Sequence, residues 1–151
     1  MPEIVVANVD VYVHRSAPEG VRHLLLRRAV DRLYEGTWRM VAGKIADGEQ
    51  AWQAAVRELW EETGLAPQAL FAIPSMNQFY EWQTDRVQSI PAFAAAVSGD
   101  PTLNEEHDLF EWLLVDEAEQ RLAWPEQRRL LRLVDHMVSS GAVPEAVRIP
   151  V

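Results

Sequence analysis

The sequence predicts an α/β fold, in which helices cover both faces of a mixed β-sheet as an α/β/α sandwich. Three observations carry this prediction. Strand-like segments run through most of the chain, a strongly helical segment lies between them near residues 50–63, and a second amphipathic helix begins near residue 125. The chain has 151 residues, 48% of them hydrophobic, with no repeat or linker, so we expect a single domain over residues 1–151.

Three strands are expected before the central helix. Apolar residues at the odd positions from Val5 to Val13 alternate with Asn8, Asp10, Tyr12 and His14, which is typical of a strand with one buried face. A turn is expected at residues 16–20. The three strands are expected at residues 5–13, 21–29 and 38–45.

The central helix carries signals at both ends and a different pattern on each face. Asp47 is expected to cap its N-terminus, with Glu49 in the first turn, and Gly64 is expected to end it in a left-handed conformation. The apolar stripe that should face the core comprises Trp52, Val56, Leu59 and Trp60. The small residues expected near the acidic face, where backbone or a ligand could approach, are Ala51, Ala54 and Ala55.

After the central helix we expect a long hairpin, a strand and a last helix. The hairpin joins residues 69–82 to residues 87–97 through a turn at Thr84-Asp85. Pro74 and Pro91 should cause irregularities in it, because proline cannot donate to the strand ladder. The remaining elements are a strand at residues 108–115 and a helix that begins near Pro125 and ends near Gly141.

Three glutamates of the central helix lie close together on one face. Glu58, Glu61 and Glu62 stand at positions i, i+3 and i+4, within an arc of roughly 100° at about 100° per residue. Carboxylates this close repel one another, whereas Mg²⁺ prefers oxygen ligands and bridges carboxylates to phosphates. The alternative interpretation, a solvated acidic face, explains neither the flanking glycines nor the arginine at position 57. The pattern therefore predicts a divalent-metal site that acts on a diphosphate.

The segment around these glutamates resembles the signature of the Nudix hydrolases at every fixed position. That signature is Gly, five residues, Glu, seven residues and then Arg-Glu-Leu-x-Glu-Glu-x-Gly-Leu. Its positions are here Gly43, Glu49, Arg57, Glu58, Leu59, Glu61, Glu62, Gly64 and Leu65. The resemblance implies a Nudix-type α/β/α sandwich with a mixed β-sheet, and a pyrophosphohydrolase that uses Mg²⁺, or Mn²⁺ in its place.

The resemblance also implies roles for individual residues. The metal ligands it implies are Glu58, Glu61, Glu62 and the backbone carbonyl of Ala42. Arg57 would pair with Glu49 and orient a carboxylate. A loop carboxylate commonly adds a metal ligand or the general base, and we favour Glu106 over Glu105, with Glu58 as an alternative base. A lone loop histidine such as His107 is more often merely exposed than catalytic.

Looser motifs resemble the branch of dATP and dihydroneopterin triphosphate pyrophosphohydrolases. They lie at residues 38–45, 78–80, 91–94, 106–107 and 124–125. The resulting hypothesis is cleavage of a nucleoside or pterin triphosphate with release of pyrophosphate. The candidate substrate-binding residues are Trp38, Lys44 and Tyr80, of which Tyr80 would stack on a flat ring. The alternatives are a pyrophosphatase for ADP-sugars, dinucleotides or oxidised nucleotides, and a nucleotide-binding regulatory domain without catalysis.

Composition limits the partners further. The formal charge is −9, without a basic stripe, so we expect binding neither to a nucleic-acid polymer nor to a membrane. A phosphorylated substrate would be repelled as well unless cations screen the site. The chain lacks cysteine, which excludes thiol catalysis and cysteine-ligated zinc. No segment resembles a signal peptide, so we expect a cytoplasmic protein, and the resemblance is compatible with a homodimer.

Overall fold

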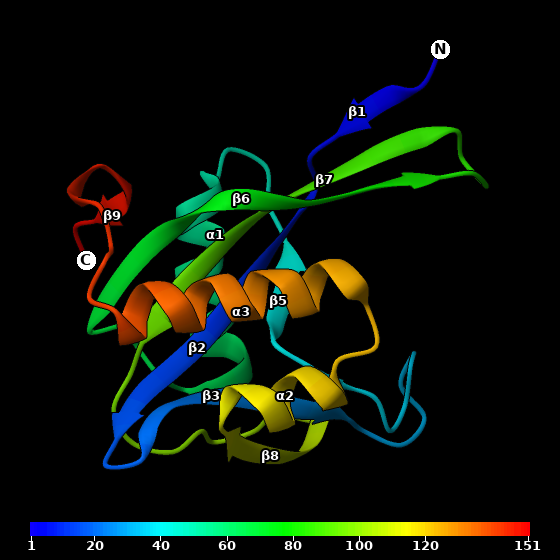
Figure 1. Cartoon of the computed structure of the whole chain (residues 1–151). Helices are drawn as coiled ribbons and strands as arrows, with labels where there is room; N and C mark the ends of the chain where they lie inside the picture. Colours follow the sequence, from blue (N-terminus) through cyan, green and yellow to red (C-terminus); the bar gives the residue numbers. More distant parts are fainter.

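The computed structural model describes residues 1–151 and confirms the α/β/α arrangement (Figure 1). A nine-stranded mixed sheet has helix α1 on one face and helices α2 and α3 on the other. The strands are β1 (Glu3–Val5), β2 (Asn8–Ala17), β3 (Gly20–Arg28), β4 (Trp38–Arg39), β5 (Val41–Lys44), β6 (Ala69–Glu81), β7 (Arg86–Ala96), β8 (His107–Leu113) and β9 (Arg148–Ile149). The helices are α1 (Ala51–Thr63), α2 (Val115–Arg121), α3 (Pro125–Ser139) and a 3₁₀ turn, η1 (Glu145–Val147).

A fork between two strands positions the segment that leads into α1. Strands β2 and β3 pair only near their hairpin, from the His14↔His23 pair to the Ala17↔Gly20 pair. Beyond this point β4 pairs with β3, and β5 pairs with β2. The single strand expected at residues 38–45 is therefore split at Met40, because its two halves hydrogen-bond to different partners. The fork brings Ala42 and Gly43 of β5 against α1.

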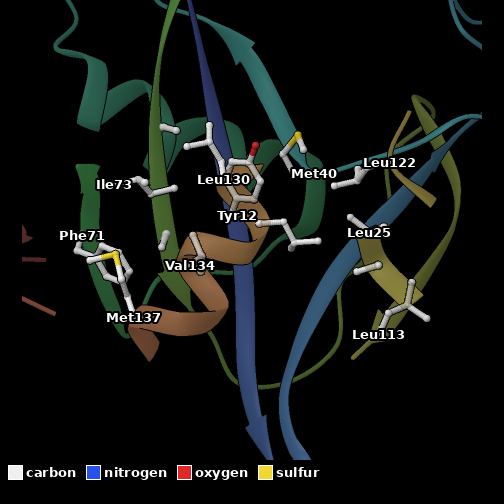
Figure 2. Packing of buried hydrophobic residues seen from close by; sticks show 14 residues of the cluster. Tyr12, Leu25, Met40, Phe71, Ile73, Leu113, Leu122, Leu130, Val134 and Met137 are labelled. Carbon is white, nitrogen blue, oxygen red and sulfur yellow. The ribbon is translucent and has the colours of Figure 1, made fainter. Parts of the chain in front are cut away.

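Strand β2 is buried on both faces, which corrects the expectation of one exposed face. Val9, Val11 and Val13 pack towards α1, whereas Tyr12 lies in the core under α3. Figure 2 shows Tyr12 beside Leu130 and Val134 of α3. The alternating pattern was a correct sign of a strand, but the even positions are covered by α3, which lies far away in the sequence. Residues 3–5, which the pattern joined to this strand in part, form the separate strand β1.

The hairpin of β6 and β7 has the predicted turn and the predicted irregularity. Its register shifts between Ala72 and Met76, where Pro74 interrupts the ladder, and pairing resumes at Met76↔Pro91. Figure 1 shows the end of this hairpin reaching beyond the body of the sheet, with β1 alongside β7. The β1–β7 and β2–β7 pairs are parallel, and the other pairs are antiparallel.

Three short elements were missed in the sequence. The strand expected at residues 108–115 ends at Leu113, and α2 begins at Val115, with Asp116 and Glu117 in its first turn and Arg121 in its last. These charges suit the helix dipole, but a seven-residue helix contains too few turns for a periodic pattern. The elements η1 and β9 at the C-terminus are shorter still. No helix has both the length and the apolar composition required to cross a membrane.

Candidate active site

Helix α1 begins later than its sequence signals indicated. Its N-cap is Gln50 rather than Asp47, and the backbone N–H of Gln50 donates to the Gln53 side chain at 2.9 Å. Glu49 therefore lies before the helix, where it accepts from the backbone N–H of Ala46 at 3.0 Å. The left-handed Gly64 ends the helix as predicted, with φ of 68°. The correction matters because Glu49, outside the helix, is free to turn back towards Arg57.

The two faces of α1 also differ from the prediction in part. Leu59 is buried, and Trp52 and Val56 pack against the core, but Trp60 is 62% exposed. Ala54 and Ala55 are fully buried against the sheet, so their small side chains admit the backbone of the sheet and not a ligand. Small side chains here let the helix approach the sheet closely.

Arg57 ties the carboxylates of the signature together. Its guanidinium donates to both oxygens of Glu49 at 2.8 and 2.9 Å, which confirms the predicted pairing. It also donates to Glu58 at 2.9 Å, to Glu61 at 3.1 Å and to the carbonyl of Lys44 at 2.7 Å. Its hydrogen bond holds the pKa of Glu49 down at about 2, so Glu49 remains charged. Arg57 thus fixes the direction of two of the three helical glutamates.

Gly43 provides the space that Glu58 occupies. A Cβ atom at position 43 would lie only 2.0 Å from the Cδ of Glu58, so any side chain there would displace the carboxylate. The side chain of Glu58 is 14% exposed, and burial raises its pKa, an effect that its hydrogen bond from Arg57 opposes. The first glycine of the signature therefore lets a carboxylate lie directly against the backbone of β5.

Glu62 is a buried carboxylate with few hydrogen-bond donors to offset the cost of burying it. It is 3% exposed and receives one long hydrogen bond, from the backbone N–H of Ala42 at 3.3 Å. Burial, followed by the charges of Glu58 and Glu106, raises its pKa to about 8. A fold gains nothing from gathering carboxylates in this way, whereas a bound cation would reverse the repulsion.

The loop before β8 completes the acidic cluster. Asn104 holds it to α1, because its amide donates to the carbonyl of Glu61 at 3.0 Å while its oxygen accepts from the N–H of Glu106 at 2.9 Å. Glu106 has a ligand atom within 4.8 Å of Glu62 and His107, whereas the side chain of Glu105 is 86% exposed and lies near Arg32. His107 is 3% exposed, which corrects the expectation of an exposed loop residue.

These residues fit a divalent cation. The donors are carboxylate oxygens of Glu58, Glu61, Glu62 and Glu106, the oxygen-rich set that Mg²⁺ or Mn²⁺ takes in proteins. The cradle that Gly43 opens for Glu58, and the buried Glu62 with too few donors, are the observations that support the fit. The backbone of Ala42 lies beside Glu62, where its carbonyl is a predicted ligand.

The three candidate substrate-binding residues are dispersed. Trp38 is half-buried in β4 and has the guanidinium of Arg121 4.8 Å from its ring centre. Lys44 ends β5 and is exposed, next to the acidic cluster through its carbonyl contact with Arg57. Tyr80 is 56% exposed near the end of the hairpin, and its hydroxyl donates to Asp85 at 2.6 Å.

A second polar group, on the α3 face, was missed because Asp10 was assigned to the exposed face of its strand. Asp10 is buried, and burial raises its pKa to about 6. Asn77 donates to it at 3.4 Å and accepts from the indole N–H of Trp124 at 3.3 Å. The ring of Phe79 meets Trp124 edge to face. Asp10 is the cross-strand partner of Ala42, so this group adjoins the acidic cluster.

Comparison with known proteins gives one family. Residues 6–134 match the family model described as the NUDIX domain. An octanoyltransferase from Myxococcus xanthus is 32% identical over 82% of this chain and 35% of its own length. The putative mutator protein MutT4 of Mycobacterium tuberculosis is 30% identical over 82% of this chain and 51% of its own length. The chain thus spans about a third to a half of these curated relatives. Among solved structures, the dihydroneopterin triphosphate pyrophosphohydrolase of E. coli superposes with a TM-score of 0.66, at 21% identity, over 87% of this chain and 94% of that one.

Proposed function

The chain is a member of the Nudix hydrolase family, and from this premise we propose that it cleaves a diphosphate bond in a nucleoside or pterin triphosphate. The products are pyrophosphate and the monophosphate, and the cofactor is Mg²⁺, with Mn²⁺ as an alternative. The observation that carries the proposal is that Glu58 and Glu62 lie against the backbone of β5, with Glu106 beside Glu62 and with Arg57 bridging Glu49, Glu58 and Glu61.

The proposed residues have two roles, as ligands of the cation and as the acceptor of a proton. The cation ligands would be Glu58, Glu61, Glu62, Glu106 and the carbonyl of Ala42. When bound, the cation lowers the pKa of a coordinated water and offsets charge that develops on the phosphates. Arg57 keeps two of the ligands aimed while the substrate enters and leaves. Glu106 would have both roles, with one carboxylate oxygen on the cation and the other accepting the proton from the attacking water, because its side chain is part of the cluster and also 44% exposed.

The charge of the whole chain supports the need for a cation. At −9, the protein repels a triphosphate from a distance, and the local cluster adds further negative charge. Lys44 lies beside this cluster, where it would contact a phosphate oxygen once the cation has reduced the repulsion.

The group of Asp10, Asn77 and Trp124 supports a substrate with a heterocyclic ring. A carboxyl, an amide and an indole N–H are the kinds of group that pair with the edge of a base or a pterin. Here they pair with one another through long hydrogen bonds of 3.3 and 3.4 Å, so a ring that binds them must offer atoms that replace these contacts. Trp38 and Tyr80 remain candidates for stacking on such a ring.

Turnover on a panel of substrates with Mg²⁺ tests the proposal. The panel contains dATP, an oxidised guanine triphosphate, dihydroneopterin triphosphate, a dinucleoside tetraphosphate and an ADP-sugar. We expect the highest kcat/KM for a triphosphate, with pyrophosphate as product. Release of orthophosphate would contradict the cleavage position, and preference for the ADP-sugar or the dinucleotide would favour the alternative pyrophosphatases. Tight binding without hydrolysis of any member would favour a regulatory domain. Light scattering on the same samples tests the homodimer.

A further inference from the structure

His107 is buried without a hydrogen-bond partner on either ring nitrogen. It is the first residue of β8, and it pairs with Arg28 at the point where the β3–β8 register shifts. Its side chain is 1% exposed, and neither Nδ1 nor Nε2 has a partner. A buried imidazole usually has at least one nitrogen satisfied, because leaving polar atoms unpaired costs about 1–3 kcal/mol each. The environment of His107 therefore lacks a partner for this ring.

The ring faces two carboxylates rather than a hydrogen-bond acceptor at normal distance. Its Nδ1 lies 3.6 Å from Oε1 of Glu62, which is too long for a hydrogen bond. A ring nitrogen, an oxygen of Glu62 and an oxygen of Glu106 all lie within 4.8 Å of one another. Atoms that share one metal ion at about 2.0–2.3 Å are roughly 3–4.5 Å apart. The three side chains are thus close to the spacing of a common ion.

The structure assigns His107 as a nitrogen ligand of one divalent cation that it shares with Glu62 and Glu106. One imidazole and two carboxylates suit Mn²⁺, Co²⁺ or Zn²⁺ better than Mg²⁺, which prefers oxygen ligands throughout. The site therefore selects a transition metal at this position, while Glu58 and Glu61, held by Arg57, offer only oxygen atoms. This inference rests on the proposed function for the presence of a metal site, and it adds the ligand atom and the choice of metal.

Pulsed electron paramagnetic resonance on the Mn²⁺-loaded chain tests this ligand directly. We expect modulation from a directly coordinated ¹⁴N nucleus, and its replacement by the ¹⁵N pattern in protein grown with ¹⁵N-histidine. Absence of nitrogen modulation in protein that binds Mn²⁺, or absence of Mn²⁺ binding, would overturn the assignment. This measurement needs no variant, so it does not depend on whether a substituted chain folds.

Two matched variants locate the nitrogen. His107→Asn should remove the modulation and weaken Mn²⁺ binding at least tenfold by calorimetry, with less than a threefold change for Mg²⁺. His14→Asn removes another buried histidine, one that lies on the opposite face of the sheet, and should change neither quantity. Modulation that persists in His107→Asn overturns the proposal. Hydrolysis of the substrate panel is scored separately: nitrogen modulation without hydrolysis would contradict the proposed function alone, and hydrolysis without modulation would contradict this inference alone.

Discussion

Two ionisable groups buried on opposite faces of the sheet are treated very differently by the fold. His23 of β3 lies under α3, and its Nε2 is 2.8 Å from a carboxylate oxygen of Asp135. Glu62 of α1 lies on the other face, with one long backbone contact and two other carboxylates contributing to its environment. Both side chains are almost completely inaccessible. His23 is matched by a neighbour of suitable chemistry, whereas Glu62 has two carboxylates near it and one long hydrogen bond to offset them.

The difference distinguishes an ionisable side chain that is buried for the stability of the fold from one that is buried to bind a ligand. The His23–Asp135 contact joins β3 to α3 and needs nothing from outside the chain. The acidic cluster weakens the isolated fold, because a buried carboxylate without sufficient donors costs free energy. Such a cost is retained where the site gains a function from it, and here a cation would satisfy the oxygen atoms. Substitutions at the two places should therefore have opposite effects on activity and stability.

Glu62→Gln should give the largest loss of activity. The amide keeps the shape of the side chain but removes a charge that the proposed cation requires, so we expect kcat/KM to fall about 10³-fold or more. Without divalent cation, the variant should melt at about the same temperature as the wild type near pH 7, where the raised pKa of Glu62 leaves its carboxyl largely protonated, and at a higher temperature above pH 8, where the wild type buries a charge. Steady-state kinetics and calorimetric melting measure both. Glu111→Gln, which alters an exposed ion pair with Arg121, is the control and should leave both unchanged. Near wild-type activity in Glu62→Gln would refute the ligand assignment.

Gly43→Ala should reduce activity by about 10²-fold while changing stability by less than about 1 kcal/mol. The new methyl group would overlap the carboxylate of Glu58, which can rotate away at small cost but then no longer lies against β5. If this is the mechanism, Gly43→Ala added to Glu58→Gln should cost little beyond Glu58→Gln alone, because neighbouring effects are not additive. Additive losses in this double-mutant cycle would show that Gly43 acts through something other than Glu58.

Arg57→Lys should lower activity by about 10- to 100-fold. An ammonium group cannot hold Glu49, Glu58 and Glu61 in fixed directions at once, as the guanidinium does. The concentration of Mg²⁺ required for half-maximal rate should rise as well, since the ligands are less well positioned. Arg132→Lys is a matched control, because Arg132 also contacts two carboxylates, Asp116 and Glu119, away from the cluster. An equal loss of activity in both variants would show that the Arg57 contacts are ordinary salt bridges that do not position the carboxylates.

The acidic face was predictable from the sequence because it is formed by residues that lie close together in the chain. The spacing of Glu58, Glu61 and Glu62 determines a shared face, and Arg57 reaches Glu49 within the same helix-and-loop unit. The same locality explains why Gly64 and the irregularity at Pro74 were predicted correctly.

The residues that the sequence did not predict depend on long-range packing. Asp10 alternates with valines as a surface residue would, and the side chain that contacts it, Asn77 of β6, lies 67 residues later in the sequence. His107 is buried because β8 pairs with β3, which no local pattern reveals. The N-terminus of α1 was misjudged because Asp47 is a favoured N-cap residue type and Gln50 is not, and the observed start depends on how β5 leads into the helix.

Lowering the pH should weaken folding stability through the buried histidines under α3. Substitution of these histidines should have the smallest effect on catalysis. His14 is the cross-strand neighbour of His23, and burial, followed by repulsion from His23, lowers the pKa of His14 to about 4. In the unfolded chain its pKa is about 6.5, so the unfolded state binds more protons between these values and the folded state loses stability as the pH falls from about 6.5 towards 4. At pH 5 the loss attributable to His14 is about 2 kcal/mol.

Urea unfolding at pH 7.5 and pH 5.0 measures this loss. His14→Gln should reduce the difference in unfolding free energy between the two pH values by this amount, whereas replacing the exposed His136 should not. Because His14 and His23 lie on the face away from the acidic cluster, kcat at pH 7.5 should stay within twofold of wild type in His14→Gln. A loss approaching that of Glu62→Gln would mean that the two faces are coupled and that the histidines are not merely structural.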